Sequence, residues 1–580
     1  MKNRNSYLIN KSLKNFMVAS IATMAIMNIN GIVDSIIMGH LIGPEAVSAI
    51  QNVVPVIGLL SGISFLFSAG ASIITAKALG RRDFDEAGSS MTAAVFSCLG
   101  VGLIISFLSG ALVPKVSSLL CQDRALYDNT YRYLFVMMAG AFLLLLFNGM
   151  SVLIETIGYP RLVSVATFST VIVNLICDIL YVKVFKMDIS GAALATLTGT
   201  LVGVAALFIF LLREREKLGI RLYFRGFAGM LGRNVVMGIP SFLGNLGLTL
   251  MILMCNYFVQ SVHGEAGVFV MSIGYAIVSF GQMISGGVQG AFLGIGGLLA
   301  AHRDYDGLRQ LLKRGLVISC GFALICVIAV LFLSGALASL FGATDPATIR
   351  LTRQGLPFIA CLNFSLSVVL PLTIMYQVND HSVISTLSAL SLLFSMGTGF
   401  LLAKNVIGNI WVAFPIGTVL SIAFVLICSI PARKRAGGNA GRIHLIPEPL
   451  DESVRFDISV PCSRERVGET VHRACDFLSG KTTHDKVMDI SQCIEELLLN
   501  YAGHSGRSEK AFMDISLVCD RDAITLVMKD DGIPFDPVHV ADKDAKTGLK
   551  IVKEYMNDAS YSYSFGQNIV VMKWEERGNE

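Results

Sequence analysis

Long apolar stretches separated by short polar ones run along the chain as far as residue 430, and beyond that point apolar and polar residues mix evenly. A helix of about 20 apolar residues is long enough to cross a bilayer. Such stretches recur about twelve times, so the pattern predicts an α-helical membrane protein with twelve transmembrane helices. The stretches lie near residues 15–38, 47–76, 91–113, 131–154, 162–184, 191–212, 236–260, 267–300, 315–340, 356–376, 383–403 and 408–430.

The second half of this apolar region repeats the first. The motif RDFD at 82–85 recurs as RDYD at 303–306, and each half contains six of the predicted spans. An even number of spans gives both halves the same orientation, which predicts a parallel repeat of two six-helix lobes with a substrate between them near the midplane. The N-lobe is predicted over residues 1–220 and the C-lobe over residues 221–435.

The remaining chain predicts a soluble domain. Residues 436–450 contain Gly and Pro and predict a linker, and residues 451–580 carry charge at the density of a soluble protein. The order of amphipathic segments predicts an α/β sandwich with helices on one face of a sheet. The expected elements are a strand at 454–460, helices at 463–479 and 484–503, strands at 512–519 and 522–529, a helix at 547–557 and a closing strand pair.

The composition supports a membrane location. With 53% hydrophobic and 15% charged residues, the chain is too apolar for a soluble globular protein. Its basic clusters fall on one side of the predicted spans, so the positive-inside rule predicts a multi-pass protein of the plasma membrane with cytoplasmic N- and C-termini. The net charge of +4 is then a topology signal, and no nucleic-acid partner is expected. The twelve cysteines lie singly, without the spacing of a zinc site or a disulfide framework.

Two acids, Asp34 and Asp178, lie inside predicted spans of the first half, and the spans of the second half contain no acid. A charged side chain in a bilayer costs about 2.5 to 3.5 kcal/mol even on lenient scales, so such residues usually bind something. Asn174 lies one helical turn before Asp178 on the same face, and Thr196 adds a hydroxyl. These groups can ligate Na⁺, or the carboxylates can share a proton. The alternative is a set of interhelical hydrogen bonds that only hold the lobe together.

A third acid, Glu155, lies near the end of a span beside GYPR. From there its side chain can either reach the membrane interface or take part in function. The sequence leaves both interpretations open.

The segment VD…GHLIG at Asp34, the element N174xxxD178 followed by GAALAT at 191–196, and the six-plus-six repeat resemble the multidrug and toxic compound extrusion (MATE) family of cation antiporters. The resemblance covers roughly residues 10–430. It implies that the lobes alternate access to export small organic compounds, cationic or amphipathic, in exchange for H⁺ or Na⁺. It also implies a coupling-ion site in the N-lobe made of Asp34, Asn174, Asp178 and Thr196. Many members carry a further acid in the C-lobe, where this chain has Cys255 and Gly399 at the positions equivalent to Asp34 and Asp178.

The tail contains residues suited to nucleotide chemistry. Glu496 and Asn500 are four apart and share a helix face, where an amide oxygen can hold Mg²⁺ and a carboxylate can accept a proton. Asp530 in KDDGIPFDP can accept from an adenine amino group, and Gly532 lets the backbone approach the ring. Gly548 begins a predicted helix whose N-terminus can face phosphate.

This series resembles the histidine-kinase-like ATPase fold, nearest to anti-sigma serine kinases. The resemblance implies an Mg-ATP site in which Asn500 is the Mg²⁺ ligand and Glu496 the catalytic base. Asp530 would read adenine, and Gly532 and Gly548 would be the glycines of the nucleotide loop. Family members usually have a second glycine where this chain has Lys546, which can contact phosphate as a point charge.

Two functions of different classes remain open. The first is a cation-coupled antiporter with a cytoplasmic nucleotide-binding domain that regulates it or receives a regulatory protein partner. The second is a membrane-tethered anti-sigma-type serine/threonine kinase switch whose transporter half acts as a sensor. The tail lacks the GxxxxGK[ST] phosphate loop of a pump motor. Export of a lipid-linked substrate is a third alternative, which basic residues in the central cavity would favour.

Overall fold

A computed structural model of the chain forms two compact units, each described here by itself. The membrane unit comprises Phe16–Ala301 and Leu312–Pro447, and the sheet unit comprises Met1–Asn15, His302–Leu311 and Glu448–Glu580. Two short segments that the sequence assigned to the lobes therefore group with the C-terminal domain. The structure describes residues 7–81, 83–120, 124–214, 223–224, 226–341, 343, 345–435, 445–448, 450–451, 453–461, 464–504, 512–520, 523–537 and 558–575.

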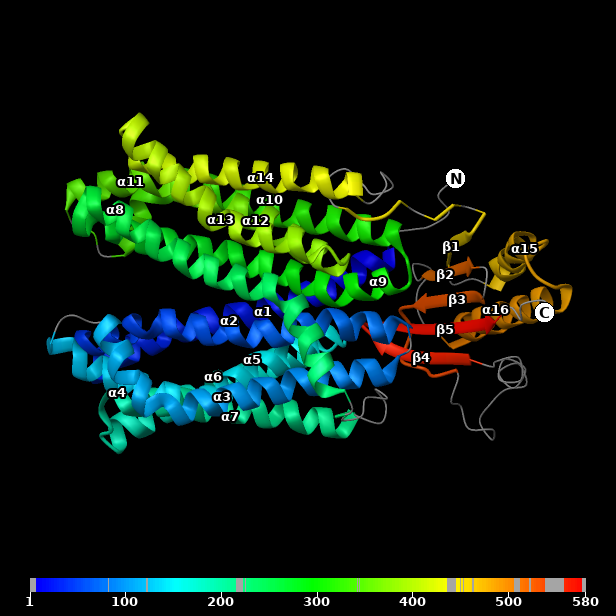
Figure 1. Cartoon of the computed structure of the whole chain (residues 1–580), viewed down its shortest axis with the longest axis horizontal. Coiled ribbons are helices and arrows are strands. Elements are labelled where there is room, and N and C mark those ends of the chain that lie inside the picture. Colours follow the sequence, from blue (N-terminus) through cyan, green and yellow to red (C-terminus); the bar gives the residue numbers. More distant parts are fainter. Residues whose placement is uncertain are drawn as a thin grey trace. The chain divides into compact units, whose positions relative to one another are not determined.

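The first lobe consists of long apolar helices (Figure 1). The last of its spans but one changes to a π-helical turn, η1, directly after Asp178, and π-turns inside helices are frequent at functional sites. The elements are α1 (Tyr7–Leu41), α2 (Pro44–Arg81), α3 (Phe84–Leu120), α4 (Arg124–Ala139), α5 (Ala141–Thr156), α6 (Pro160–Asp178), η1 (Ile179–Val184) and α7 (Asp188–Glu214).

The second lobe repeats this order. Its first two spans form the single element α8, which is broken by non-helical dihedral angles at Gly264. A π-turn, η3, again precedes the final span. The elements are α8 (Phe227–Ala291), η2 (Phe292–Gly296), α9 (Gly297–Ala301), α10 (Tyr305–Leu340), α11 (Pro346–Ala360), α12 (Leu362–Val378), α13 (Ser382–Leu402), η3 (Ala403–Ile407), η4 (Ile410–Val412) and α14 (Ala413–Arg435).

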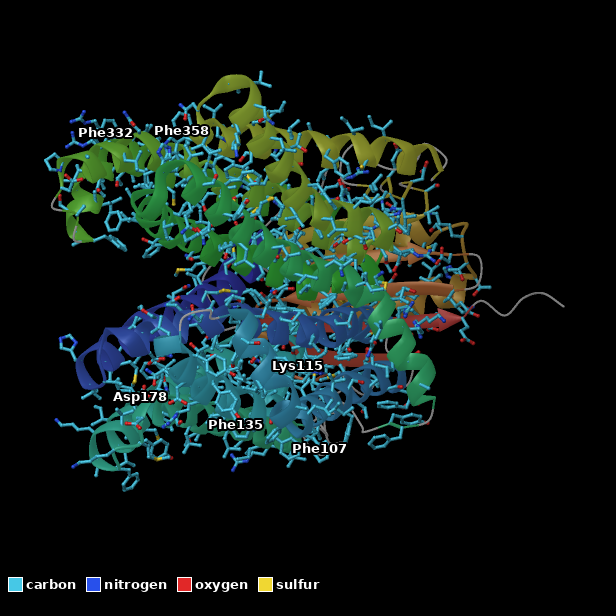
Figure 2. All side chains as sticks on the ribbon, turned by 60° about the vertical axis from the view of Figure 1, so that its left-hand side comes forward. Phe107, Lys115, Phe135, Asp178, Phe332 and Phe358 are labelled. Carbon is cyan, nitrogen blue, oxygen red and sulfur yellow. The ribbon has the colours of Figure 1, made fainter. Side chains whose placement is uncertain are left out.

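The predicted membrane architecture is confirmed. Among the described residues, 11 helices are long and apolar enough to cross a membrane, or up to 12 if the pair formed by α4 and α5, bent by 57°, is one span. The outer surface of these helices carries large apolar side chains such as Phe107 and Phe332, which are 89% and 83% exposed (Figure 2). Apolar side chains exposed in this way are stable in lipid, whereas their exposure to water would cost free energy.

The RDxD repeat performs the same structural task in each lobe. The carboxylate of Asp83 accepts a hydrogen bond of 2.8 Å from the backbone N–H of Glu86 at the start of α3. The carboxylate of Asp304 accepts one of 2.9 Å from the backbone N–H of Gly307 at the start of α10. Each Asp satisfies a donor that the first turn of a helix leaves unpaired, so the repeat marks equivalent helix starts.

The lobes contact each other near the basic ends of their helices. Asn234 of α8 exchanges two hydrogen bonds with Ser90 of α3, of 2.8 and 2.9 Å. Lys77 of α2 pairs with Asp380 at 2.7 Å. A Cβ atom on Gly238 of α8 would overlap the backbone of α2 at Leu66, so only glycine permits this close approach. These contacts hold the two lobes together at the ends of the helices that carry the basic clusters.

The sheet unit contains one five-stranded antiparallel sheet in the order β1-β2-β3-β5-β4 (Figure 1). The predicted strands and both predicted amphipathic helices are present, and the helix expected at 547–557 lies outside the described residues. The elements are β1 (Arg455–Pro461), η5 (Arg464–Arg466), α15 (Val467–Leu478), α16 (His484–His504), β2 (Phe512–Cys519), β3 (Ala523–Asp530), β4 (Asp558–Ser564) and β5 (Gln567–Glu575).

Alternation along the strands decides which side chains form the core of this unit. Every second residue of β2, β3 and β5 packs against α15 and α16, as the residue pairs Ile515 and Leu517, and Leu526 and Met528, illustrate. The helices therefore cover one sheet face, which confirms the predicted sandwich. The intervening residues point to the other face, and several of them, including Val527, are also buried.

Candidate functional site

The two intramembrane acids of the N-lobe lie together. Asp34 comes from α1, and Asp178 is the last residue of α6, so the π-turn η1 begins directly after it. The side chains of Asp34 and Asp178 interact with each other. The side-chain amide of Asn30, one turn before Asp34, donates to Asp34 Oδ2 at 3.0 Å. Two carboxyl groups from different helices thus share one site inside the lobe.

Several polar atoms of this site have no partner among the described residues. They are Asp34 Oδ1, Asp178 Oδ2, and both side-chain amide atoms of Asn174. Asp178 and Asn174 are 1% and 2% exposed. A buried polar group without a partner costs about 1 to 3 kcal/mol, and a charged one costs more. A proton or a small cation can satisfy the unpaired oxygens among these atoms, because oxygens are the ligands that hard cations prefer. The donor set therefore fits both of the predicted coupling ions.

Thr196 joins this site through a residue that the sequence did not single out. The hydroxyl of Tyr133 in α4 interacts with the hydroxyl of Thr196 and lies within electrostatic reach of Asp34 and Asp178. Tyr133 is 6% exposed. Thr196 Oγ1 also donates to the backbone carbonyl of Ala192 in its own helix, at 3.2 Å. The only sequence signal for Tyr133 was a polar atom in a predicted span, which does not distinguish a ligand from a packing residue.

A cavity of about 370 Å³ lies between the two lobes. Glu155 of α5 lines it, so the structure places this acid at the cavity and not at the membrane interface. Opposite Glu155, an added Cβ on Gly290 of α8 would lie 3.5 Å from Glu155 Oε2. The other polar groups around the cavity are amides and hydroxyls, and no Lys or Arg of the described chain lines it. They include Asn148, Ser151, Ser241, Asn245, Gln282 and Gln289.

Among its described residues, the C-lobe has no carboxylate pair equivalent to that of the N-lobe. Cys255, the counterpart of Asp34, is fully buried. Gly399, the counterpart of Asp178, lies so close to α14 that an added Cβ would be 2.6 Å from the backbone oxygen of Ala413. The repeat is therefore symmetric in its helices and asymmetric in its chemistry.

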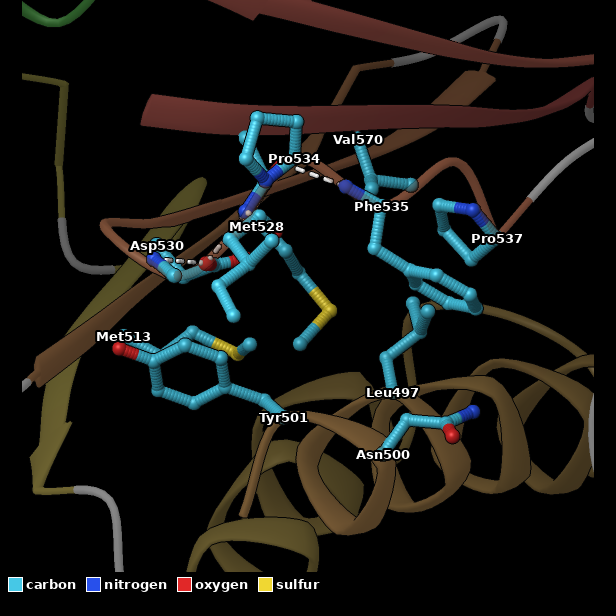
Figure 3. Close-up of a pocket in the computed structure, with 13 residues that line it drawn as sticks. Leu497, Asn500, Tyr501, Met513, Met528, Asp530, Pro534, Phe535, Pro537 and Val570 are labelled. Atoms are coloured by element: carbon cyan, nitrogen blue, oxygen red, sulfur yellow. Dashed lines mark hydrogen bonds between the residues drawn. The ribbon is translucent and has the colours of Figure 1, made fainter. Parts of the chain in front are cut away.

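In the sheet unit, a pocket of about 240 Å³ lies between α16 and the chain that follows β3 (Figure 3). Its walls are apolar and include Leu497, Met513, Met528 and Val570, and Phe535 covers one side. Flat apolar walls of this kind suit an aromatic ring system. Asn500 lies at one end of the pocket, and Asp530 lies at the other.

Asp530 is held in place by Asn568 of β5, directly opposite it in the β3–β5 register. Asp530 Oδ1 accepts from the side-chain amide of Asn568 and from the backbone N–H of Gly532, both at 2.7 Å. Within the described chain Oδ2 has no such partner and can accept from a ligand. Burial raises the pKa of Asp530 to about 6, although these hydrogen bonds act in the opposite direction.

Asn568 organises the whole turn after β3. Its carbonyl oxygen accepts from the backbone N–H of Phe535 at 3.2 Å and from the hydroxyl of Tyr561 at 2.7 Å. Its amide also donates to the backbone carbonyl of Ile533 at 3.2 Å. Asn568 lies in the predicted closing strand pair, but its role depends on the strand register, which the sequence did not reveal.

The predicted nucleotide residues are only partly brought together. Asn500, Asp530 and Gly532 line the pocket. Glu496 is half-buried on the same helix as Asn500 and is not among the lining residues. Lys546 and Gly548 lie outside the described residues.

Comparison with known proteins assigns the membrane unit. The family model described as MatE matches residues 19–180 and 240–404, one segment in each lobe. The chain belongs to the MatE family. A model described as the histidine kinase-like ATPase domain matches residues 460–574, which confirms the predicted resemblance of the C-terminal domain.

Curated relatives of this MatE protein include the multidrug export protein MepA of Staphylococcus aureus (strain bovine RF122 / ET3-1), 23% identical over 359 residues. That match covers 60% of this chain and 78% of the relative. MepA of Staphylococcus haemolyticus (strain JCSC1435) is 23% identical over 344 residues, 59% of this chain and 75% of the relative.

Solved structures share the fold. A MOP superfamily transporter from Pyrococcus furiosus, described as having a binding pocket of reverse polarity, superposes with a TM-score of 0.66 at 19% identity, over 76% of this chain and 98% of that one. The outward-facing conformation of a multidrug resistance MATE family transporter gives a TM-score of 0.65 at 19% identity over the same shares of the two chains. The membrane unit of this multi-pass protein therefore has the MATE fold.

Proposed function

We propose that this protein is an antiporter that exports organic compounds by alternating access and is driven by inward movement of H⁺ or Na⁺ at the site of Asp34 and Asp178. It acts in the plasma membrane with both chain ends in the cytoplasm, as the distribution of basic clusters indicates. The C-terminal domain binds Mg-ATP and regulates transport.

The observation that carries the proposal is the convergence of unpaired oxygens in the N-lobe. Asp34 Oδ1 and Asp178 Oδ2 have no partner among the described residues. Asn174, which lies in α6 with Asp178, presents a side-chain amide that also has no partner among them. A cation bound there neutralises two like charges, and its release restores their repulsion. The charge of the site therefore changes when the cation binds. A cation that binds one conformation of the lobes more tightly than the other shifts the equilibrium toward that conformation.

The cavity supports an organic cation or amphiphile as the exported substrate. Its lining combines apolar groups such as Met24, Met27 and Phe65 with the carboxylate of Glu155. Thioether side chains adapt to ligands of varied shape. The name of the relative MepA describes multidrug export, which agrees with a loosely specified cavity. The lack of basic lining residues in the described chain disfavours an anionic lipid-linked substrate.

Transport in inverted vesicles tests the coupling site. An imposed pH or Na⁺ gradient, applied one at a time, is expected to drive uptake of a fluorescent organic cation. Asp34→Asn and Asp178→Asn are each expected to abolish the response to the gradient, while the exposed Asp85→Asn serves as a matched control. Uptake that follows the gradient equally well in Asp34→Asn vesicles would refute the assignment, and the gradient that works identifies the ion.

The nucleotide function rests on the pocket between α16 and the turn after β3. When bound, Mg²⁺ would balance the charge of the nucleotide phosphates, and Asn500 can supply one of its oxygen ligands. The adenine ring would lie between Met528 and Phe535, with Asp530 Oδ2 accepting from its amino group. We propose nucleotide binding as the function of this pocket, and Glu496, the predicted base, lies half-buried on the same helix as Asn500.

Titration of the full-length protein in nanodiscs with Mg-ATP tests this part of the proposal. We expect saturable binding that is lost in Asp530→Ala and weakened in Asn500→Ala. Absence of binding by the unmutated protein would reduce the domain to a scaffold. Transfer of the γ-phosphate to a protein serine, if observed and abolished by Glu496→Ala, would favour the kinase alternative.

A further inference from the structure

A second acid follows the nucleotide-pocket residue Asp530 and faces away from the pocket. Asp531 is 2% exposed, and its Oδ1 accepts from the hydroxyl of Tyr501 at 2.9 Å. Tyr501 belongs to α16, and its ring lines the pocket. Tyr501 therefore contacts both the pocket and Asp531, so a ligand bound in the pocket can change how Asp531 is held.

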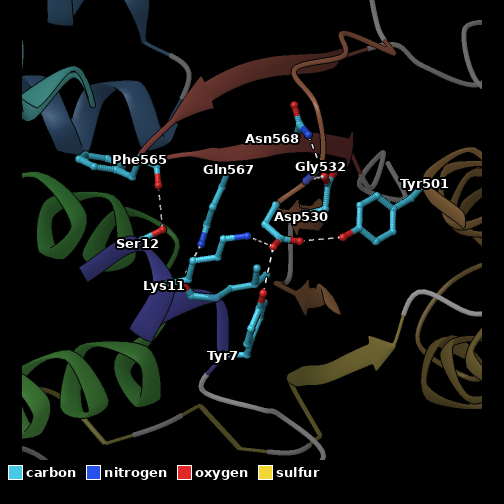
Figure 4. Close-up of polar contacts among 11 residues, drawn as sticks. Tyr7, Lys11, Ser12, Tyr501, Asp530, Gly532, Phe565, Gln567 and Asn568 are labelled. Atoms are coloured by element: carbon cyan, nitrogen blue, oxygen red, sulfur yellow. Dashed lines mark hydrogen bonds and ion pairs between the residues drawn. The ribbon is translucent and has the colours of Figure 1, made fainter. Parts of the chain in front are cut away.

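The other oxygen of Asp531 contacts Lys11 and Tyr7 in the first turns of α1, and Figure 4 labels both of these α1 residues. Lys11 forms an ion pair with Asp531 Oδ2, and the hydroxyl of Tyr7 donates to the same oxygen at 3.3 Å. Burial raises the pKa of Asp531, but the hydrogen bonds from Lys11 and Tyr501 outweigh it and lower the pKa below its ordinary value. The carboxylate is thus charged at neutral pH and needs Lys11 as its partner.

The β4–β5 hairpin adds backbone contacts to the same part of α1. Ser12 donates to the backbone carbonyl of Phe565 at 2.9 Å, and the side-chain amide of Gln567 donates to the backbone carbonyl of Leu8 at 3.0 Å (Figure 4). Together with the Lys11 ion pair, these contacts hold one face of α1, because Leu8, Lys11 and Ser12 are three and four positions apart. The first turns of α1, up to Asn15, therefore belong to the same compact unit as the sheet.

The sheet unit also holds the start of α10. Arg455 of β1 donates to the backbone carbonyls of His302 and Arg303, at 3.0 and 2.8 Å. Its guanidinium lies 3.9 Å from the carboxylate of Asp304, and both of these side chains are buried. Nη1 of Arg303 in turn donates to both carboxylate oxygens of Asp520, at 2.9 and 3.0 Å. The RDYD copy of the repeat thus has contacts with the sheet in addition to its helix-capping role.

The two helices held in this way continue into different lobes. From Phe16 onward α1 belongs to the membrane unit and carries Asp34 of the N-lobe, and from Leu312 onward α10 belongs to the C-lobe. Along the chain, both starts carry basic clusters, which the positive-inside rule assigns to the cytoplasmic side. Alternating access requires the lobes to separate on that side in one of the two states.

We propose that the C-terminal domain is a nucleotide-controlled brace: it holds the cytoplasmic starts of α1 and α10 together, and nucleotide in the Asp530 pocket tightens its hold through Tyr501, Asp531 and Lys11. The nucleotide part rests on the function proposed above. A bound base fixes the ring of Tyr501 and the turn at Gly532, and so fixes Asp531 between them. The brace then favours the state that is closed toward the cytoplasm.

Coupling of this kind is reciprocal, which gives the first test. In full-length protein in nanodiscs, Lys11→Ala is expected to weaken binding of a fluorescent ATP analogue by about fivefold or more, because a coupling free energy acts on both sites. Lys14→Ala removes an exposed positive charge one turn away and is the matched control, expected to bind as the unmutated protein does. Equal affinity in Lys11→Ala and Lys14→Ala would overturn the nucleotide link.

The second test does not need nucleotide. Spin labels at Asp85→Cys and Lys313→Cys, exposed positions on α3 and α10, report the separation of the lobes on the cytoplasmic side by pulsed electron paramagnetic resonance. The combined change Lys11→Ala and Arg303→Ala is expected to add a population at longer distance, and the ATP analogue is expected to narrow the distribution of the otherwise unmutated protein.

An unchanged distance distribution in the Lys11→Ala and Arg303→Ala protein would overturn the brace. A protein that binds no nucleotide, yet opens when the two contacts are removed, would refute the proposed nucleotide function and leave a permanent brace. The two failures are therefore distinguishable.

Discussion

The substitution Asp530→Asn separates charge from shape at the nucleotide pocket. Asparagine keeps an oxygen that can accept from Asn568 and from the backbone N–H of Gly532, as Oδ1 of the aspartate does at 2.7 Å. It removes the negative charge and turns the remaining oxygen into a donor. The variant is therefore expected to lose nucleotide binding while its fold is preserved or strengthened.

The expected stabilisation follows from the pKa of Asp530. Burial raises this pKa from 3.8 to about 6. The folded state thus favours the protonated acid. The free energy of unfolding therefore falls as the pH rises from the pKa of Asp530 in the unfolded chain to its pKa in the folded protein. At about 1.4 kcal/mol per pH unit, the ionised carboxylate costs about 1 kcal/mol at pH 4.5 and about 3 kcal/mol at pH 7.5. Asp530→Asn does not carry this cost.

A single tryptophan can report the stability of the domain. Trp574 of β5 is buried in the core of the sheet unit, and the other tryptophan, Trp411, lies in the membrane unit. In a Trp411→Phe background, urea unfolding followed by Trp574 fluorescence is expected to show that Asp530→Asn stabilises the domain by about 2 kcal/mol more at pH 7.5 than at pH 4.5.

The neighbouring acid provides the matched control. The pKa of Asp531 is lowered, so its charge stabilises the fold above the unfolded pKa, and this stability is lost as the pH falls through the folded pKa. Asp531→Asn is therefore expected to destabilise the domain at pH 7.5. A stabilisation by Asp530→Asn that is the same at both pH values, or a destabilisation at pH 7.5, would refute the reasoning.

Three further predictions follow from close contacts and from the cavity. Gly238→Ala is expected to lower the free energy of unfolding by about 1 to 3 kcal/mol, since the added methyl group overlaps the backbone of Leu66, and the thermal midpoint in detergent reports the loss. The control is Gly229→Ala, where an added Cβ has nothing within 4 Å, and a similar loss there would contradict the argument. Asn568→Ala removes the amide that organises the turn after β3, so weaker Mg-ATP binding is expected by calorimetry, and unchanged affinity would exclude that role. Glu155→Gln is expected to raise the KM for a cationic dye but not for a neutral one in vesicle transport, and an equal effect on both would remove Glu155 from substrate binding.

Much of the fold was predictable because membrane helices and amphipathic elements leave periodic signals. The apolar stretches correspond to the described spans, and the strand predicted at 512–519 has those bounds in the structure. The bend between α4 and α5 and the π-turn after Asp178 were not predicted. Both depend on how a helix meets its neighbours, and apolar periodicity carries no information about that.

The candidate sites divide in the same way. Asp34 and Asp178 stood out because an acid in an apolar span is costly wherever the chain folds. Tyr133, Asn568 and Tyr501 did not, since a tyrosine or asparagine is unremarkable in sequence and acquires its role only from what lies opposite it. For Glu155 the sequence left two interpretations open, and only the cavity between the lobes shows where its side chain lies.

Local chemistry along the chain thus determined the spans, the repeat, the tail domain and the acids that need a ligand. Tertiary structure alone decided that the start of α1 and the RDYD turn belong to the same compact unit as the tail. Lys11 and Asp531 are 520 residues apart. An ion pair between such distant positions depends on the geometry of a folded sheet, and neither residue differs in sequence from an ordinary surface charge.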